Sequence, residues 1–190
     1  MTLLLTGSRE HALLAMLVQE AGAAVQQSGG YLGRTAIQKI AYFLQVRGVP
    51  MRYRFDLHYY GPFCDTVSRD LEWLLADKAV VDQSLNPEKY SNYRLGPATD
   101  ELLALHSQEL EPHRKTVKDV VRALHPFDPQ RLELVATLHY LYREQTASRR
   151  SGPWKEAVVA RFREVKGGKF SAEAVSETYD RLVAAGLLKP

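Results

Sequence analysis

The side chains best suited to chemistry are few in this sequence. Cys64 is the single cysteine, and His58 is the histidine nearest to it along the chain. A catalytic thiolate needs a histidine and an orienting group within hydrogen-bonding distance. Because Cys64 follows Gly61-Pro62-Phe63 at the expected start of a helix, a small buried side chain is the better interpretation. The sequence therefore predicts no catalytic residue and no enzyme.

A metal site is suggested only by His106, Glu109 and His113. Their spacing places them on one face of a helix, as metal ligands often are. No cysteine or third histidine follows at ligand spacing, and the neighbouring Glu111 and Arg114 indicate a charged, solvated face. We therefore expect neither a metal nor another cofactor.

A basic and aromatic segment covers residues 34–54. Its cations can neutralise phosphates and its rings can stack on bases, which is how many proteins bind nucleic acids. The alternative is that the rings fill the core and only the cations face solvent, which is usual for aromatic residues at helical or strand spacing. If nucleic acid is bound, the expected surface consists of Arg34, Lys39, Arg52 and Arg54.

Hydrophobic periodicity predicts the elements that position these residues. Helical spacing is found over about 9–27, 35–46 and 65–77, with Ser8 and Thr35 as N-caps of the first two helices. Alternating residues over 53–59 predict an extended segment, and short apolar runs at 79–81 and 93–95 predict a β-hairpin. The predicted core of this part comprises Leu17, Ile40, Phe43, Leu44 and Trp73.

Further helical patterns cover about 99–124, 129–145 and 154–165, and a last helix begins after Ser171. We therefore predict a mainly α fold. Its first domain, residues 1–96, is winged helix-turn-helix-like with a small β-hairpin, because three helices and then a hairpin are the order of that motif. Its second, residues 97–190, is a helical C-terminal region packed on the first.

One stretch of the sequence resembles a known family. The residues that carry the resemblance are Gly33-Arg34-Thr35-Ala36-Ile37-Gln38-Lys39-Ile40-Ala41-Tyr42-Phe43-Leu44-Gln45, then Tyr53-Arg54-Phe55 and Tyr59-Tyr60-Gly61-Pro62-Phe63. They look like the signature of the YwgA-like proteins and are more distantly similar to the Panacea domain of SocA-like antitoxins. The resemblance covers about residues 33–75. It implies a winged-helix-like fold and a role as antitoxin, adaptor or regulatory partner.

The third predicted helix bears on the choice between protein and nucleic acid as partner. In a DNA-binding winged helix this helix enters the major groove and needs basic or amide side chains. Here Arg69 and Lys78 are outnumbered by acids, giving a net charge of −2. The acids are Asp65, Asp70, Glu72 and Asp77. An acidic helix is repelled by DNA, so we expect a protein partner.

The expected protein interface combines this helix with the turn before it. Tyrosines are frequent anchors of protein interfaces, although Tyr59 and Tyr60 could instead brace the Gly61-Pro62 turn. We predict an interface formed by Tyr59, Tyr60, Arg69 and Asp70, with a toxin or a regulatory protein as partner. Binding of DNA or RNA by residues 34–54 is the alternative function, and the oligomeric state is left open.

Composition agrees with a globular protein. The 190 residues are 45% hydrophobic and carry a formal net charge of +3, too small to indicate nucleic-acid binding by itself. The single cysteine excludes an internal disulfide and fits a reducing compartment. No apolar run approaches the roughly 20 residues that span a bilayer, and no signal peptide is recognised. We therefore expect a cytoplasmic protein without a membrane segment.

Overall fold

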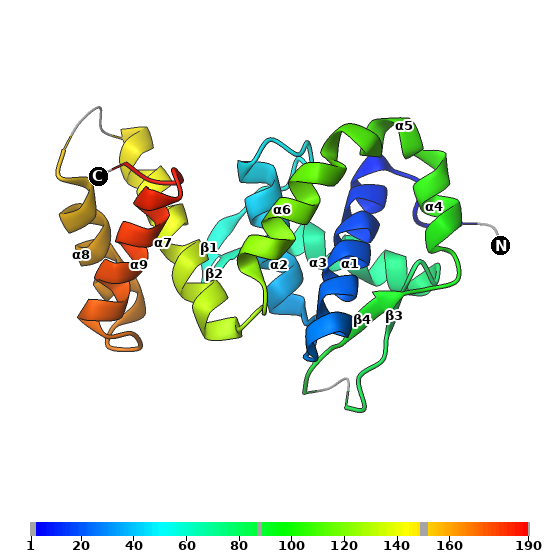
Figure 1. Cartoon of the computed structure of the whole chain (residues 1–190), viewed down its shortest axis with the longest axis horizontal. Helices are drawn as coiled ribbons and strands as arrows, with labels where there is room; N and C mark the ends of the chain where they lie inside the picture. Colours follow the sequence, from blue (N-terminus) through cyan, green and yellow to red (C-terminus); the bar gives the residue numbers. More distant parts are fainter. Residues whose placement is uncertain (1–2, 87–88, 149–151, 190) are drawn as a thin grey trace. The chain divides into compact units, whose positions relative to one another are not determined.

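The computed structural model describes residues 3–86, 89–148 and 152–189 (Figure 1). Its chain forms two compact units. The first unit contains residues 1–55 and 64–128, and the second contains residues 56–63 and 129–190. The second unit is therefore assembled from two segments that are far apart in the sequence.

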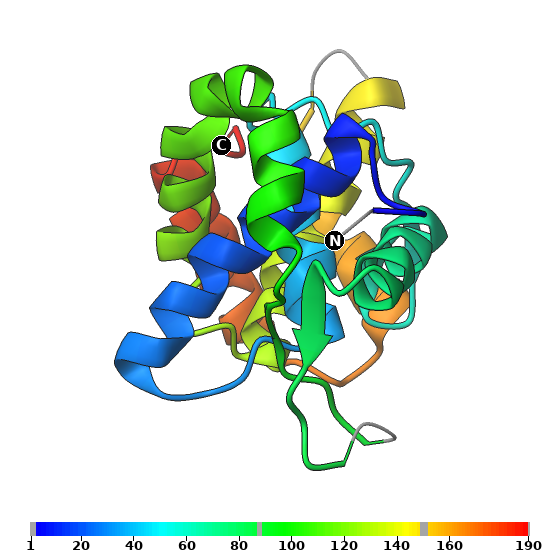
Figure 2. The same ribbon diagram turned by 90° about the vertical axis from the view of Figure 1, so that its right-hand side faces the viewer.

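The first unit is mainly helical and carries one β-hairpin (Figures 1 and 2). Strands β3 and β4 are antiparallel, with Val80 opposite Leu95. The elements in order are α1 (Arg9–Ser28), α2 (Arg34–Val46), α3 (Asp65–Ala76), β3 (Val80–Asp82), β4 (Tyr93–Leu95), α4 (Thr99–Leu105), α5 (Ser107–Leu110), the 3-10 helix η1 (Glu111–His113) and α6 (Arg114–Leu124).

Helix α1 is the centre of the first unit. The Ser8 hydroxyl accepts a hydrogen bond from the His11 backbone N–H, and the Ser8 N–H donates to His11 Nδ1, which forms a capping box. Every residue from Ala12 to Val18 is fully buried, as expected for a helix surrounded by other elements. Helix α1 packs against α2, α3, α4, α6 and β4.

Helices α4 and α6 belong to this unit because they pack on α1, and α6 also packs on α2. Apolar residues of α6 recur at helical spacing, and Val117, Val121 and Leu124 are buried. The boundary that we expected at residues 96 and 97 therefore differs from the division in the structure, where the first unit continues to residue 128.

The second unit combines a small hairpin with three helices. Strands β1 (Asp56–His58) and β2 (Gly61–Phe63) are antiparallel, and β2 packs on α7. The helices are α7 (Pro129–Ser148), α8 (Trp154–Lys166) and α9 (Ala172–Ala184), and both α8 and α9 pack on α7. Their core includes Leu138, Leu141, Phe162, Val175 and Tyr179.

The predicted mainly α fold is confirmed, and several local expectations need correction. Thr35 is not an N-cap, because α2 begins at Arg34 and Gly33 occupies the cap position. Trp73 is only partly buried and packs edge-on against His11, so it does not join the core. The other predicted core residues, Leu17, Ile40, Phe43 and Leu44, are buried. Ser171 caps α9 as expected.

The extended segment is shorter as a strand than we expected. Alternation does hold, since Met51 and Tyr53 are buried while Arg52 and Arg54 are exposed. The backbone of Tyr53, however, is paired with a side chain: Gln45 accepts from the Tyr53 N–H and donates to its carbonyl, both at 2.7 Å. Strand pairing begins only at Asp56, where β2 supplies the partner.

Candidate functional site

The turn between β1 and β2 presents two tyrosines to solvent. His58 lies opposite Gly61 in the hairpin register, which leaves Tyr59 and Tyr60 as the two turn residues. Gly61 has a φ of 87°, a left-handed conformation that glycine adopts without steric cost. Tyr59 is 75% exposed and Tyr60 is 57% exposed. The rings therefore do not simply brace the turn against the core.

A buried charge cluster anchors this turn to the helices of the second unit. The Glu133 carboxylate on α7 is 2.9 Å from Lys166 Nζ and 2.8 Å from Lys169 Nζ. The side chains of Glu133 and Lys166 are both 3% exposed. Lys166 Nζ also donates a hydrogen bond to the Tyr59 carbonyl, so the turn backbone is tied to the cluster. A buried charge without such partners would be strongly destabilising.

Lys169 connects the charge cluster to the aromatic rings. Its Nζ lies 5.3 Å from the centroid of Tyr59, 5.1 Å from that of Tyr60 and 5.8 Å from that of Phe170. These are cation–π distances. The two tyrosine rings are 4.8 Å apart in an edge-to-face arrangement. The hydrogen bond to Glu133 raises the pKa of Lys169, so its ammonium stays charged at neutral pH.

The local sequence explains how the end of α8 and the turn after it position the two lysines. The helix ends at Lys166, and Gly167 follows with a φ of 57°, which reverses the chain before Lys169. Phe170 is partly buried and packs against the core of the second unit, directly before the Ser171 cap. We name the exposed surface formed by Tyr59, Tyr60 and Lys169 the tyrosine hairpin.

The tyrosine hairpin is suited to binding rather than to catalysis. Two large rings held on an anchored turn lose little conformational entropy when a partner covers them. Lys169, paired with Glu133, adds a cation over both tyrosine rings. Glu133 is enclosed by the two lysines, so its carboxylate is engaged in positioning them.

Of the other two predicted interface residues, only Arg69 is at the surface. Its guanidinium stacks on Trp73, 5.3 Å from the ring centroid. Asp70 is 5% exposed, accepts a hydrogen bond from the Tyr53 hydroxyl at 2.9 Å and lies 3.7 Å from His11 Nε2. The expectation that Asp70 contributes to an interface is therefore wrong, because its carboxylate joins α1, α3 and the segment after α2 inside the first unit.

The surface of α3 is also less acidic than its sequence. Asp77, like Asp70, is buried, at 7% exposure. The exposed acids Asp65 and Glu72 are balanced by the exposed cations Arg69 and Lys78. The net charge of −2 is thus not presented to solvent, and the argument that this helix repels DNA loses its basis.

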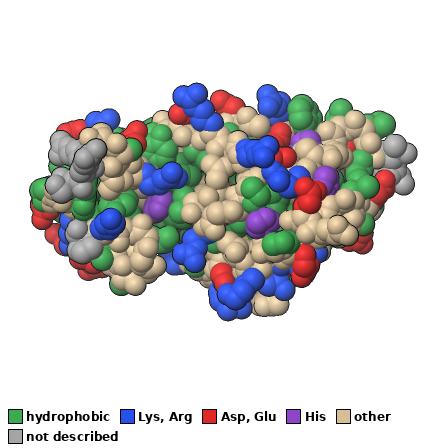
Figure 3. Space-filling view, turned by 90° about the horizontal axis from the view of Figure 1, so that it is seen from above, with side chains coloured by type: hydrophobic (Ala, Val, Ile, Leu, Met, Phe, Trp, Pro, Cys, Tyr) green, Lys and Arg blue, Asp and Glu red, His purple; other side chains and the backbone are tan. Residues whose placement is uncertain are grey.

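The proposed nucleic-acid surface is likewise altered. Lys39 is 2% exposed, so it is not available to contact phosphates. Arg34 and Arg52 flank opposite ends of α2, whose 13 residues span about 20 Å, and Arg34 Nε donates to Ser91 Oγ. Arg54 is exposed. On the face shown in Figure 3, Lys and Arg side chains lie among acidic and hydrophobic ones rather than in one basic patch.

The residues weighed for catalysis and metal binding occupy structural positions. Cys64 is 3% exposed, and its backbone exchanges two hydrogen bonds with the Gln38 side chain. His106 Nδ1 lies 2.7 Å from Glu109, which raises the His106 pKa. Within the described ranges, no three potential ligands converge as a metal site, and no helix is long and apolar enough to cross a membrane.

Sequence reasoning identified the two tyrosines but missed Glu133, Lys166 and Lys169. The latter are more than 70 residues away in the sequence, and their only local signal is a glycine pair between two lysines. No protein-family model matches the chain, and no curated protein matches it significantly. The candidate site is therefore identified from the geometry of the structure.

Proposed function

We propose that this protein is a non-enzymatic regulatory or adaptor protein that acts through protein contacts, with the tyrosine hairpin as its working surface. The observation that carries the proposal is the exposure of Tyr59 and Tyr60 on a turn that buried charges hold in place. Exposed aromatic rings with a polar edge, held rigid before binding, are typical of interface hot spots.

The first unit supports a regulatory role of the winged-helix kind. Within the first unit, helices α1, α2 and α3 precede the β3–β4 hairpin, as three helices precede the wing in that fold, although β1 and β2 of the second unit interrupt the chain between α2 and α3. The resemblance of residues 33–75 to YwgA-like proteins and antitoxin domains points in the same direction. An antitoxin-like protein binds and blocks a partner, which requires an exposed recognition surface and no reaction centre.

Capture of partners from the native cells tests this proposal. The bait is the full chain, compared with a Tyr59→Ala/Tyr60→Ala variant whose circular dichroism is unchanged. We expect the variant to retain at most about a tenth of the captured partner, because the loss of central aromatic anchors costs about 2 kcal/mol or more.

The chain supplies a matched control in Tyr31 and Tyr90. These exposed tyrosines of the first unit also form a ring pair, with centroids 5.6 Å apart. A Tyr31→Ala/Tyr90→Ala variant should capture the partner as the native chain does. Equal capture by the native chain and the Tyr59/Tyr60 variant would remove the tyrosine hairpin as the interface.

Nucleic-acid binding remains the alternative to be tested separately. Phosphate contacts produce an affinity that falls steeply with salt. A mobility shift of duplex and single-stranded DNA or RNA, compared with an Arg52→Glu/Arg54→Glu variant, measures that contribution. We expect no salt-dependent shift that this variant abolishes.

A further inference from the structure

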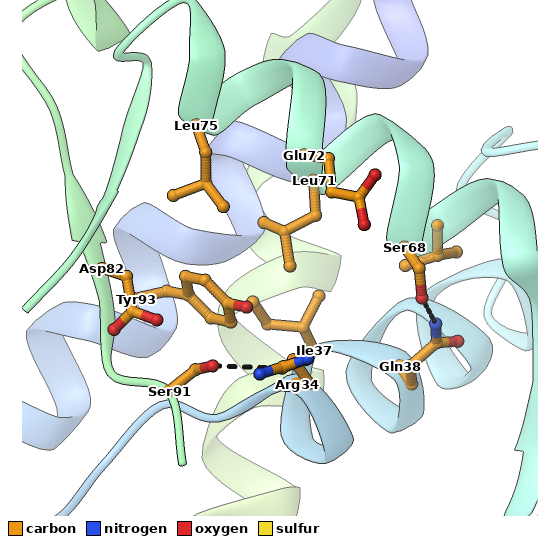
Figure 4. A pocket seen from close by; sticks show the side chains of 11 residues that line it. Arg34, Ile37, Gln38, Ser68, Leu71, Glu72, Leu75, Asp82, Ser91 and Tyr93 are labelled. Atoms are coloured by element: carbon orange, nitrogen blue, oxygen red, sulfur yellow. Dashed lines mark hydrogen bonds between the residues drawn. The ribbon is translucent and has the colours of Figure 1, made fainter. Parts of the chain in front are cut away.

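The first unit contains a pocket of about 250 Å³ between α2, α3 and the β3–β4 hairpin (Figure 4). It is unrelated to the tyrosine hairpin, which lies in the second unit. One wall is aliphatic and is formed by Ile37, Val67, Leu71 and Leu75. Such a volume is below the usual range for drug-sized ligands and admits a small molecule or one side chain of a partner.

Several polar groups of the pocket are already committed to the protein. The Gln38 amide binds the backbone of Cys64 and the Ser68 hydroxyl. Ser91 accepts from Arg34 Nε at 3.1 Å. Asp82 accepts from the backbone N–H groups of Ser84 and Asn92 at 2.9 and 2.8 Å. These bonds fix the shape of the pocket.

The rest of the pocket lining is charged and aromatic. Arg34, Glu72 and Asp82 together leave the lining with one net negative charge. Burial raises the pKa of Asp82, but its backbone hydrogen bonds lower it by more, so the carboxylate stays ionised. Tyr93 is 4% exposed and directs its hydroxyl into the pocket. Burial is the largest cause of its raised pKa, which the hydrogen bond with Ser91 and the charge of Arg34 lower and the charges of Asp82 and Glu72 raise, so the hydroxyl stays neutral.

An aliphatic wall, an aromatic ring, the exposed Glu72 carboxylate and a net negative charge together fit an alkyl chain with a cationic end. The chain packs on Leu71, Leu75 and Ile37, and the cation is attracted by Glu72 and by the Tyr93 ring. We infer that this pocket binds an alkylammonium or alkylguanidinium group, carried either by a free amine or by a lysine or arginine side chain of another protein.

Methyl NMR titration of the full chain with butylamine tests the inference, with the signals of Leu71 and Leu75 as the readout. Butanol and butanoate have the same chain without the positive charge. We expect butylamine to shift these signals and the other two compounds to bind at least about tenfold more weakly. Acetyl-lysine amide and acetyl-arginine amide represent the side chains of a protein partner.

Two variants locate the binding. Glu72 is exposed, so Glu72→Gln should fold normally while weakening butylamine binding about tenfold. Glu144→Gln removes an equal charge from the second unit and should leave the affinity unchanged. Binding of butylamine but not of the acetylated amides identifies a free amine, and the reverse identifies a protein side chain. Absence of binding by every cation, equal binding of butanol or butanoate, or full affinity of Glu72→Gln would each overturn the inference.

Discussion

Asp77 fastens the N-terminal segment to the end of α3. Its Oδ2 atom accepts hydrogen bonds from the backbone N–H groups of Leu4, Leu5 and Thr6 and from the Thr6 hydroxyl, at 2.7 to 3.1 Å. Burial raises the Asp77 pKa, but these hydrogen bonds lower it by more. The ionised carboxylate is therefore stabilised in the folded state.

Substitution of Asp77 by Asn should lower the free energy of unfolding by about 2 kcal/mol, because a charged acceptor of several hydrogen bonds is lost. Urea denaturation at neutral pH measures the loss. The stabilisation by Asp77 is complete above the ordinary Asp pKa and decreases as the pH falls below it, since the folded-state pKa is lower. Asp119→Asn, which removes only an exposed pair with Lys115, serves as the control.

Substitution of Glu133 should destabilise the protein more than substitution of an exposed acid, because Glu133 pairs with two lysines. A Glu133→Gln substitution leaves the buried Lys166 without its carboxylate, so we expect the free energy of unfolding to fall by about 3 kcal/mol. Thermal and urea denaturation measure the loss. A Glu133→Leu/Lys166→Met variant should recover most of it, because it removes both buried charges and leaves only the partly exposed Lys169 without its carboxylate. Native stability of Glu133→Gln would show that the cluster does not anchor the turn.

The residue types of the candidate site were readable from the sequence, but their surroundings were not. The sequence indicates Tyr59 and Tyr60 because clustered tyrosines are frequent anchors of protein interfaces. The sequence indicates Asp70 because the helix that carries it is rich in acids, which suits a basic partner. Its burial depends on Tyr53 and His11, which no local pattern connects to it.

At the scale of elements, the connection after β4 is limited by a close backbone approach. A Cβ atom at Gly96 would lie 2.1 Å from the Lys78 carbonyl oxygen, and the backbone there is held by the Gly96 N–H bond to Ala79. Gly96→Ala should therefore destabilise the protein by about 2 kcal/mol or more, because backbone atoms must move. Urea denaturation measures this effect.

Gly22 in α1 is the matched control for Gly96. Apart from the adjacent residues and the backbone of the helix itself, no atom of the protein lies within 4 Å of a Cβ at this position. Gly22→Ala should raise the free energy of unfolding by about 0.5–1 kcal/mol, because alanine favours the helix. If both substitutions changed stability in the same direction, crowding at Gly96 would not be the cause.

Helices were the most predictable elements, since apolar residues at helical spacing and caps such as Ser8 and Ser171 mark them directly. The expected N-cap of α2, Thr35, lies two residues after the observed one, because Gly33 supplies no side chain that would mark it as a cap. Strands were less predictable. The backbone partner of Tyr53 is the Gln45 side chain, and neither periodicity nor propensity reveals such a bond.

At the scale of the whole molecule, the division into units follows from which apolar faces meet. Residues 56–63 belong to the second unit because Leu57 packs on its core and β2 packs on α7. Sequence order alone would place this hairpin in the first unit, because the residues before and after it belong to that unit. The second unit therefore depends on a segment inserted within the sequence of the first.

The two units should respond differently to acid. His139 on α7 is 3% exposed, and burial, with a contribution from Arg143, lowers its pKa to about 4. The unfolded chain binds this proton at an ordinary His pKa near 6.5, so stabilisation by neutral His139 is complete above that pH and is lost as the pH falls toward 4. In the first unit, His106 has a raised pKa, so its contribution is complete below the ordinary His pKa and is lost only as the pH rises above it.

The two tryptophans make this difference measurable, because Trp73 lies in the first unit and Trp154 in the second. Single-tryptophan variants, Trp73→Phe and Trp154→Phe, each report one unit through the wavelength of maximum emission during urea denaturation. From pH 7 to pH 5 we expect the second unit to lose about 2 kcal/mol of its free energy of unfolding. The first unit should lose none, since Asp77 and Asp82 have lowered pKa values and titrate below that range. His139→Gln should remove most of the pH dependence of the free energy of unfolding that Trp154 reports for the second unit. Equal losses of this free energy in both units would refute the assignment to His139.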